Sequence, residues 1–293
     1  MTLLRESARA KVNLTLRVHG RRDDGYHDIE SLVVFADCAD TLTLEVGRDL
    51  KLVTVGPGAS DCGDGADNLV LRVARALGEK VDGMIGGTFT LDKHLPVAAG
   101  IGGGSADAAA ALRLLATANG IALDDPRIAE VARATGADIP VCVLSRPCTM
   151  TGVGENLSFL KIPALPSVMI NPRVAVATKD VFGALGLAKG ETHGDASKAS
   201  KGEWPASDAD VDAWLKVISA QTNDLEPPAL QVEPIIGDVL AALRGTSGIR
   251  LARMSGSGAT CFGIFSDDAS ARAAAIAISK ARPNWWVHAG TLS

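Results

Sequence analysis

A glycine-dense stretch from Leu95 to Leu112 offers the first chemistry in this chain. It reads LPVAAGIGGGSADAAAAL and passes into strong helix formers from Ser105 onward. Glycine lets a backbone approach a ligand or another backbone closely, and the first N–H groups of a helix have no partners inside it. Together these features make a site that can hold an anion such as phosphate. A tight loop before an alanine-rich core helix is the alternative, and the local pattern leaves both open.

Two polar residues near the N-terminus, Lys11 and Asn13, are the next candidates. Apolar and polar side chains alternate from Ala10 to Val18, which predicts a half-buried strand with Lys11 and Asn13 on its polar face. That face is either solvated or part of a polar site, and the alternation alone does not decide between them.

Tyr26 and His27 end a loop that begins at Gly20 and contains the turn signal Asp24-Gly25. Tyr26 is the sole tyrosine of the chain. An amphipathic ring beside an imidazole suits stacking on a planar base, although Tyr26 could equally cover the edge of the core.

Asp138 is a carboxylate between a helix expected to end at Gly136 and an apolar run, Val141–Leu144, that we interpret as a buried strand. Pro140 pushes the preceding residue, Ile139, toward extended geometry. A buried carboxylate needs a partner. Nearby backbone N–H groups could supply it, and a role in catalysis is the other interpretation.

Both strands and helices are expected to position these residues. Besides the strand over 10–18, strands are expected at Leu32–Phe35, Thr41–Val46, Leu50–Val55, Thr88–Leu91, Ser167–Ile170, Ile249–Met254, Thr260–Phe265 and Trp285–Ala289. Helices are expected after the capping residues Asn68 and Thr178, after Asp124 or Asp125 with Pro126, and at Val211–Ser219, Val232–Arg244 and Ala269–Lys280. The polar stretch Gly186–Asp210 is expected to be a long loop or partly disordered insert, with Trp204 as its anchor.

Length and composition narrow the class of protein. The 293 residues fit two domains, and 47% hydrophobic residues supply ample core. A net charge of −5 argues against a general nucleic-acid surface and favours a small-molecule partner. The five cysteines have no CxxC spacing, so neither a zinc site nor a disulfide framework is indicated. With no signal-peptide pattern and no membrane-length apolar run, we expect a cytoplasmic protein without a membrane partner.

Several familiar sites are absent from the sequence. There is no GxxxxGK[ST], no GxSxG and no zinc-type histidine pair. The stretch Gly100–Ser105 is superficially close to the dinucleotide motif GxGxxG, but it lies deep in the chain, after several strands, and no acidic residue follows a second strand at the distance that a ribose contact needs.

Three segments together resemble the GHMP small-molecule kinases. They are Ala10-Lys-Val-Asn13, the run Pro96-x-x-x-Gly100-x-Gly-Gly-Gly-Ser105, and Ser255-Gly-Ser-Gly258, and they span nearly the whole chain. Within that family, Arg22-x-Asp-Gly-Tyr-His27 and Gly136-Ala-Asp-Ile-Pro140 are similar to a member whose substrate is a cytidine-diphosphate-linked branched sugar alcohol.

The resemblance implies an α+β fold of two domains. The first, over 1–162, would be like domain 2 of ribosomal protein S5, and the second, over 163–293, would be ferredoxin-like, with the active site in the cleft between them. It also implies ATP-dependent phosphorylation of the 2-hydroxyl of that alcohol, with Mg²⁺, in the non-mevalonate route to isoprenoid precursors. The expected state is a monomer or weak homodimer.

The resemblance also implies roles for individual residues. Asp138 would be the general base and Lys11 its cationic neighbour. The substrate would contact Asn13, Tyr26, His27 and Phe182, with the base between Tyr26 and Phe182. The nucleotide would contact Asn68, Lys93, Pro96, Gly100, Gly102, Gly103, Gly104 and Ser105. The metal ligands stay unassigned, because Ser105-Ala106 stands where many members have paired serines.

Two alternatives remain. The fold could serve another small alcohol, such as a mevalonate or homoserine derivative, although the Tyr26-His27 loop argues against this. A non-catalytic RNA-binding module is the second, and the acidic balance argues against it.

Overall fold

The chain forms two compact units, each assembled from separated segments. In this computed structural model, residues 2–62, 65, 67–193 and 204–293 are described. Unit 1 comprises Met1–Lys11, Cys38–Val97 and Gly102–Ser145, and unit 2 comprises Val12–Asp37, Ala98–Ile101 and Arg146–Ser293. The family's division after residue 162 stays a prediction.

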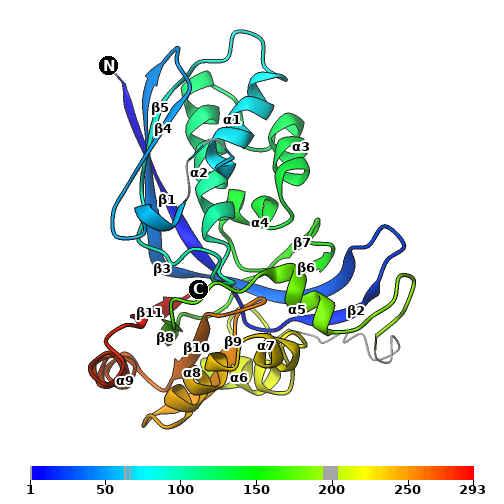
Figure 1. Cartoon of the computed structure of the whole chain (residues 1–293), viewed down its shortest axis with the longest axis vertical. Helices are drawn as coiled ribbons and strands as arrows, with labels where there is room; N and C mark the ends of the chain where they lie inside the picture. Colours follow the sequence, from blue (N-terminus) through cyan, green and yellow to red (C-terminus); the bar gives the residue numbers. More distant parts are fainter. Residues whose placement is uncertain (1, 63–64, 66, 194–203) are drawn as a thin grey trace. The chain divides into compact units, whose positions relative to one another are not determined.

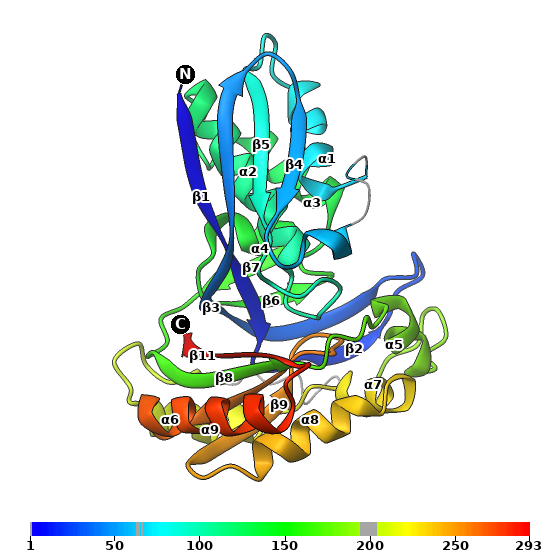
Figure 2. The same cartoon turned by 60° about the vertical axis from the view of Figure 1, so that its left-hand side comes forward.

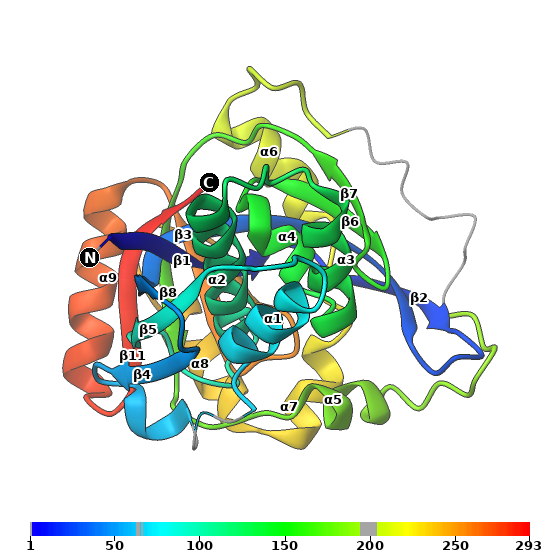
Figure 3. The same cartoon turned by 90° about the horizontal axis from the view of Figure 1, so that it is seen from above.

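Unit 1 is a sheet covered by helices on one face (Figure 1). Its strands are β1 (Leu3–Asn13), the second half of β3 (His27–Gly47), β4 (Lys51–Val55) and β5 (Gly86–Asp92). Its helices are η1 (Ala59–Cys62), α1 (Leu69–Gly78), α2 (Gly103–Asn119), α3 (Pro126–Thr135) and α4 (Ile139–Leu144). Strand β5 pairs antiparallel with β3 and parallel with β4. Helix α2 packs against α1 and α4, and α3 packs on the same two helices (Figure 3).

Two predicted helix starts in unit 1 are confirmed with their caps. The side chain of Asn68 accepts a hydrogen bond from the N–H of Val70 at the start of α1. Asp125 does the same for Arg127 at the start of α3, where Pro126 is the first helical residue. Each cap satisfies an N–H group that the helix itself leaves without a partner.

The predicted strand at Val141–Leu144 is wrong, because this run belongs to helix α4. Ile139, expected to be extended, is the first residue of that helix, and Pro140 lies in the first turn, where its missing N–H costs nothing. A short apolar run has no periodicity that separates a buried strand from a buried helix.

The strands of unit 2 are β2 (Arg17–Arg21), the first half of β3, β6 (Cys148–Gly152), β7 (Asn156–Phe159), β8 (Leu165–Asn171), β9 (Ile249–Met254), β10 (Cys261–Phe265) and β11 (Trp286–Leu292). Four of them are antiparallel neighbours in the order β11-β8-β10-β9. Strands β2 and β6 pair with β3, and β7 pairs with β6. The helices of unit 2 are α5 (Thr178–Ala184), α6 (Val211–Ser219), α7 (Glu226–Val232), α8 (Ile235–Arg244) and α9 (Asp268–Ala281). Helices α8 and α9 pack on the sheet through a continuous apolar core (Figure 2).

Three expectations in this part of the chain need correction. The strand expected over 10–18 is interrupted at residues 14–16, between β1 and β2. The helix expected from Val232 begins at Ile235, and α7 precedes it without having been predicted. Thr178 is the first residue of α5 rather than its cap.

The polar insert over 186–210 is described only in part, because residues 194–203 lie outside the described residues. Residues 190–193 pair with β2 through backbone hydrogen bonds, including Arg21 N–H to Glu191 C=O at 2.8 Å. Trp204 stacks on the buried Trp214 with ring centroids 6.1 Å apart, as its anchoring role predicts. In the part of the chain that the structure describes, no helix is both long and apolar enough to cross a membrane.

Candidate active site

The glycine-rich loop leads into α2 through residues with left-handed backbone geometry. Gly100 and Gly102 have φ values of 74° and 63°, which glycine adopts without strain. Gly102 is the N-cap of α2, and within the described residues the first helical turn has no capping hydrogen bond from a side chain. These groups are therefore donors that a bound anion can use.

Residues 98–101 of the loop touch the second glycine-rich turn, Ser255–Gly258. The hydroxyl of Ser255 donates to the carbonyl of Gly100 at 3.1 Å, and Thr260 N–H donates to Ala99 C=O at 3.1 Å. A Cβ at Gly100 would lie 2.6 Å from the Ser255 and Gly258 carbonyl oxygens. The structure thus brings together two motifs that stand 155 residues apart, and Gly100 allows their close approach.

Lys11 and Asp138 form an ion pair in unit 1, with Lys11 Nζ and Asp138 Oδ2 3.0 Å apart. The Lys11 side chain is 4% exposed and that of Asp138 is 36% exposed. Asp138 immediately precedes α4 but makes no capping hydrogen bond with it. The carboxylate is therefore held by a cation while one side of it remains open to a small molecule.

Gly102 lies directly over this pair. A Cβ at Gly102 would be 3.2 Å from Lys11 Cε and 4.0 Å from Asp138 Oδ2. Any larger residue would need Lys11 to move, so glycine serves here for both its backbone angle and its lack of a side chain.

Asn13 is buried and hydrogen-bonded, not on a solvated strand face. Its side-chain amide donates to the Ser31 hydroxyl at 2.7 Å, and its backbone N–H donates to the Ser255 hydroxyl at 3.1 Å. Its Oδ1 lies 3.3 Å from the position of a Cβ at Gly256. Asn13 thus belongs to the polar contacts around the second glycine-rich turn.

The residues expected to bind a planar base gather in unit 2. The rings of His27 and Phe182 stack with centroids 4.5 Å apart, and Tyr26 is 63% exposed. The Nε2 atom of His27 is buried without a hydrogen-bond partner within the described residues. Burial and the Arg21 cation lower the pKa of His27, which favours the neutral form of its ring.

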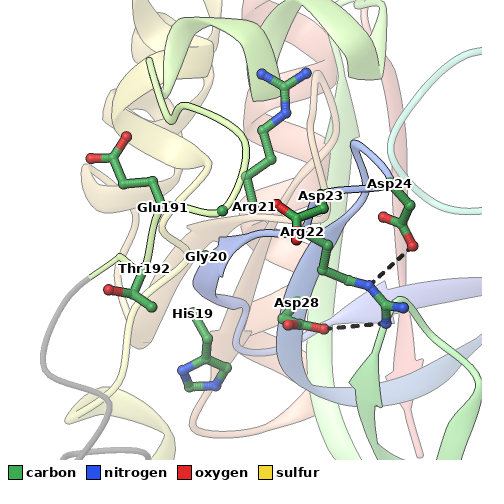
Figure 4. A pocket seen from close by; sticks show the side chains of 10 residues that line it. His19, Gly20, Arg21, Arg22, Asp23, Asp24, Asp28, Glu191 and Thr192 are labelled. Atoms are coloured by element: carbon green, nitrogen blue, oxygen red, sulfur yellow. Dashed lines mark ion pairs between the residues drawn. The ribbon is translucent and has the colours of Figure 1, made fainter.

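A pocket of about 500 Å³ lies beside this hairpin, at the turn between β2 and β3 (Figure 4). It is lined by His19, Gly20, Arg21, Arg22, Asp23, Asp24, Asp28, Gly190, Glu191 and Thr192. Arg22 pairs with Asp24 at 3.2 Å and Asp28 at 3.7 Å across its wall. None of the residues expected to bind the base lines it, so we assign it no ligand.

Lys93 is enclosed by carboxylates instead of facing solvent. Its ammonium lies 2.6 Å from Asp40 Oδ2 and 2.7 Å from Asp107 Oδ2, and all three side chains are at most 4% exposed. Burial alone would lower the pKa of Lys93, but Asp107 and Asp40 outweigh it and raise that pKa. Burial raises the pKa of Asp107 to about 7, against the opposing effect of Lys93.

Models of the two halves of one protein family match this chain. The GHMP kinases N terminal domain matches residues 68–146, and the GHMP kinases C terminal domain matches residues 209–284. This chain belongs to the GHMP kinases. It is a small-molecule kinase with the mixed α+β fold of that family, as predicted.

Curated relatives of this GHMP kinase extend over its whole length. A protein of Rhodopseudomonas palustris named 4-diphosphocytidyl-2-C-methyl-D-erythritol kinase is 66% identical over 99% of this chain and 97% of its own. A protein of the same name from Nitrobacter hamburgensis is 65% identical to this chain, over 100% of this chain and 96% of its own length.

Solved structures agree on the fold. A crystal structure of 4-(cytidine 5'-diphospho)-2C-methyl-D-erythritol kinase has a TM-score of 0.74 and 33% identity, covering 99% of both chains. A homoserine kinase from Cytophaga hutchinsonii has a TM-score of 0.72 at 19% identity, covering 100% of this chain and 95% of its own, and shows the fold alone.

The sequence did not predict that Asp40 and Asp107 would surround Lys93. Asp107 stands in a run of alanines on α2, and Asp40 lies in the middle of β3. For Asp107 the available signal was a single acid inside a run of alanines, because a buried carboxylate requires a cation. Asn68 has a structural role, because its side chain caps α1. Of the residues expected to bind the nucleotide, Gly104 is exposed and Ser105 is half-buried.

Proposed function

We propose that this GHMP kinase transfers the γ-phosphate of ATP to the 2-hydroxyl of 4-diphosphocytidyl-2-C-methyl-D-erythritol, in the non-mevalonate route to isoprenoid precursors. The observation that carries the proposal is the whole-length identity of 66% to a relative named for that substrate. The segment Arg22-x-Asp-Gly-Tyr-His27 adds to it, because this part of the chain is where we expect the cytidine to be recognised.

The acceptor would be recognised in unit 2. Tyr26 is exposed, and Phe182 already stacks on the ring of His27. Aromatic rings bind a flat base by offset stacking, and Asn13 would donate or accept hydrogen bonds at the polar end. The orphaned Nε2 of His27 gives a polar atom that such a base can satisfy.

The donor would be held at the glycine-rich loop. We propose that the N–H groups from Gly100 to Ser105 bind the triphosphate, and that Asn68 and Pro96 lie near the rest of the nucleotide. No side chain of the described residues caps the first turn of α2 with a hydrogen bond, which fits an anion.

Mg²⁺ would accompany the nucleotide. Among the described residues, no group of three or more His, Cys, Asp or Glu side chains could hold a metal ion. Mg²⁺ commonly takes one or two protein carboxylates and completes its shell with substrate phosphates and water. The donor set here fits an ion held mainly by the phosphates, whose charge it neutralises.

Asp138 would act as the general base. Its partly exposed carboxylate accepts the proton of the hydroxyl, the freed oxygen attacks the γ-phosphorus in line, and the bond to the leaving ADP oxygen breaks. Lys11, 3.0 Å from Asp138, orients the carboxylate and balances its charge. Because phosphoryl transfer depends mostly on positioning and charge, these two residues and the loop supply what the step requires.

A coupled ADP-release assay tests the proposal. With Mg·ATP, the cytidyl alcohol should be turned over, and mevalonate and homoserine should not. Absence of turnover with the cytidyl compound refutes the assignment, and turnover of mevalonate or homoserine instead would keep the kinase and change its acceptor.

A further inference from the structure

The buried ion cluster of Lys93, Asp40 and Asp107 lies at the base of the glycine-rich loop. Lys93 follows β5, Asp40 is on β3, and Asp107 is on α2. The distances from Lys93 Nζ to the two carboxylates are 2.6 and 2.7 Å, and the three side chains are 3%, 0% and 4% exposed. In this geometry the ammonium has no route to a phosphate in solvent.

Asp40 also holds the start of the loop through its second oxygen. Its Oδ1 accepts hydrogen bonds from the backbone N–H groups of His94 and Leu95, the latter at 2.8 Å. The backbone of Lys93 is itself bonded, because its N–H donates to Val55 C=O at 2.8 Å and its C=O accepts from Gly58 N–H at 2.9 Å. These hydrogen bonds therefore fix the backbone of residues 93–95, which leads into the loop.

Asp107 holds the end of the loop. It lies one helical turn after Gly103, the first residue of α2. A Cβ at Gly103 would lie 3.3 Å from Lys93 Nζ, so the ammonium sits directly against the first turn. Lys93 thus links Asp40, at the entry of the loop, to Asp107, at its exit.

From this arrangement we infer that Asp40, Lys93 and Asp107 form a clamp that joins the two ends of the loop and positions its N–H groups for the nucleotide phosphates. Lys93 is then a positioning residue and not a phosphate ligand. The inference rests on the proposed function only in taking the loop as the nucleotide site. Removing one member of a buried charge cluster leaves the others uncompensated, so the loop ends should separate.

The direct test is the affinity of the full chain for Mg·ADP, measured by calorimetric titration without any acceptor. Asp107→Ala removes an acceptor of the Lys93 hydrogen bond and should raise the Kd about 10-fold, the usual worth of one charged hydrogen bond. Asp107→Asn keeps an oxygen that accepts from Lys93 and should stay within about 3-fold of wild type. The KM for the alcohol should be the same in all three proteins.

A matched control lies on the same helix. Arg113 pairs with Glu6 at 2.8 Å and donates to the backbone carbonyl of Ser7 at 2.7 Å. Arg113→Met removes an ion pair from α2 away from the loop, so it should lower the melting temperature and leave the Kd for Mg·ADP unchanged. If Asp107→Ala does not fold, Asp107→Ser takes its place.

The outcomes separate the two claims. An Asp107→Ala protein that melts earlier but binds Mg·ADP like wild type overturns the clamp, because the cluster would then only stabilise the fold. Equal weakening in Arg113→Met would overturn it as well. A wild-type chain that binds Mg·ADP but does not phosphorylate the cytidyl alcohol removes the proposed acceptor and leaves the clamp standing. Wild type that binds no Mg·ADP refutes both.

Discussion

Two lysines of unit 1 face carboxylates, and the two sites differ in access to solvent. Lys11 pairs with Asp138, whose side chain is 36% exposed, whereas Lys93 pairs with Asp40 and Asp107, which are at most 4% exposed. The first site can exchange a proton with a small molecule. The second is sealed and can act only through the backbone that it holds.

The glycines at the start of α2 lie over these two sites in turn. A Cβ at Gly102 would meet Lys11, and a Cβ at Gly103 would meet Lys93. The residue types alone are the same in both sites, so exposure is what distinguishes a candidate reactive pair from a candidate structural one. Four experiments can break or sharpen this distinction.

The largest effect is expected for Asp138→Asn. An amide cannot accept the hydroxyl proton, so kcat should fall about 10²- to 10⁴-fold, the usual range for a lost general base. The Kd for Mg·ADP and the melting temperature should change little, because the site is partly open. A variant with near-native kcat would make Asp138 structural.

Replacing each of the two lysines should cost a different amount of free energy of unfolding. Lys93→Met leaves two buried carboxylates without their cation and should lower the free energy of unfolding by about 3–5 kcal/mol. Lys11→Met leaves Asp138 in contact with solvent and should cost about 1 kcal/mol. Urea unfolding measures both, and equal losses would contradict the distinction.

Gly102→Ala should lower kcat about 100-fold, because a displaced Lys11 would move the base, and a misplacement of about 1 Å can cost that much in rate. Gly120→Ala is its control. Gly120 caps the other end of α2 with φ of 64°, against 63° at Gly102, and a Cβ there meets nothing within 4 Å. Both variants bear the same backbone strain. A similar kcat in the two would show that strain, not contact with Lys11, matters.

The fourth experiment concerns the pH dependence of stability. Burial raises the pKa of Asp107 to about 7, against about 3.9 for an unfolded aspartate. Between those values only the folded chain holds the proton, so this contribution to the free energy of unfolding decreases as pH rises from about 4 to about 7 and is level above.

Asp107→Asn removes the titrating group and keeps the hydrogen bond to Lys93. The wild type should therefore lose stability relative to this variant as pH rises, most of it below pH 7. Urea unfolding of both proteins between pH 5 and 8 gives the difference. Parallel curves would mean that Asp107 does not carry a proton near neutrality.

Local signals made much of the fold predictable. Asn68 and Asp125 with Pro126 placed two helix starts, because capping depends on a few adjacent residues. The apolar run Val141–Leu144 was misassigned, since its helical state comes from packing against α2 and α3, which sequence does not display.

The candidate site divides in the same way. Lys11 and Asp138 were paired in advance only through the family resemblance, and the ion pair agrees with it. The surroundings of Lys93 could not be foreseen, because Asp40, Lys93 and Asp107 meet from three separate elements. Nor does the chain's periodicity indicate that His27 stacks on Phe182, 155 residues later.

The adjacent Gly102 and Gly103 look like parts of one motif in the sequence, yet each is required for a different reason. Substitution at Gly102 should be selected against for the sake of catalysis and at Gly103 for the sake of folding and nucleotide affinity. A mutational scan of the chain that scored growth alone would rank the two alike. Scored for abundance and turnover separately, it should divide a single motif into two.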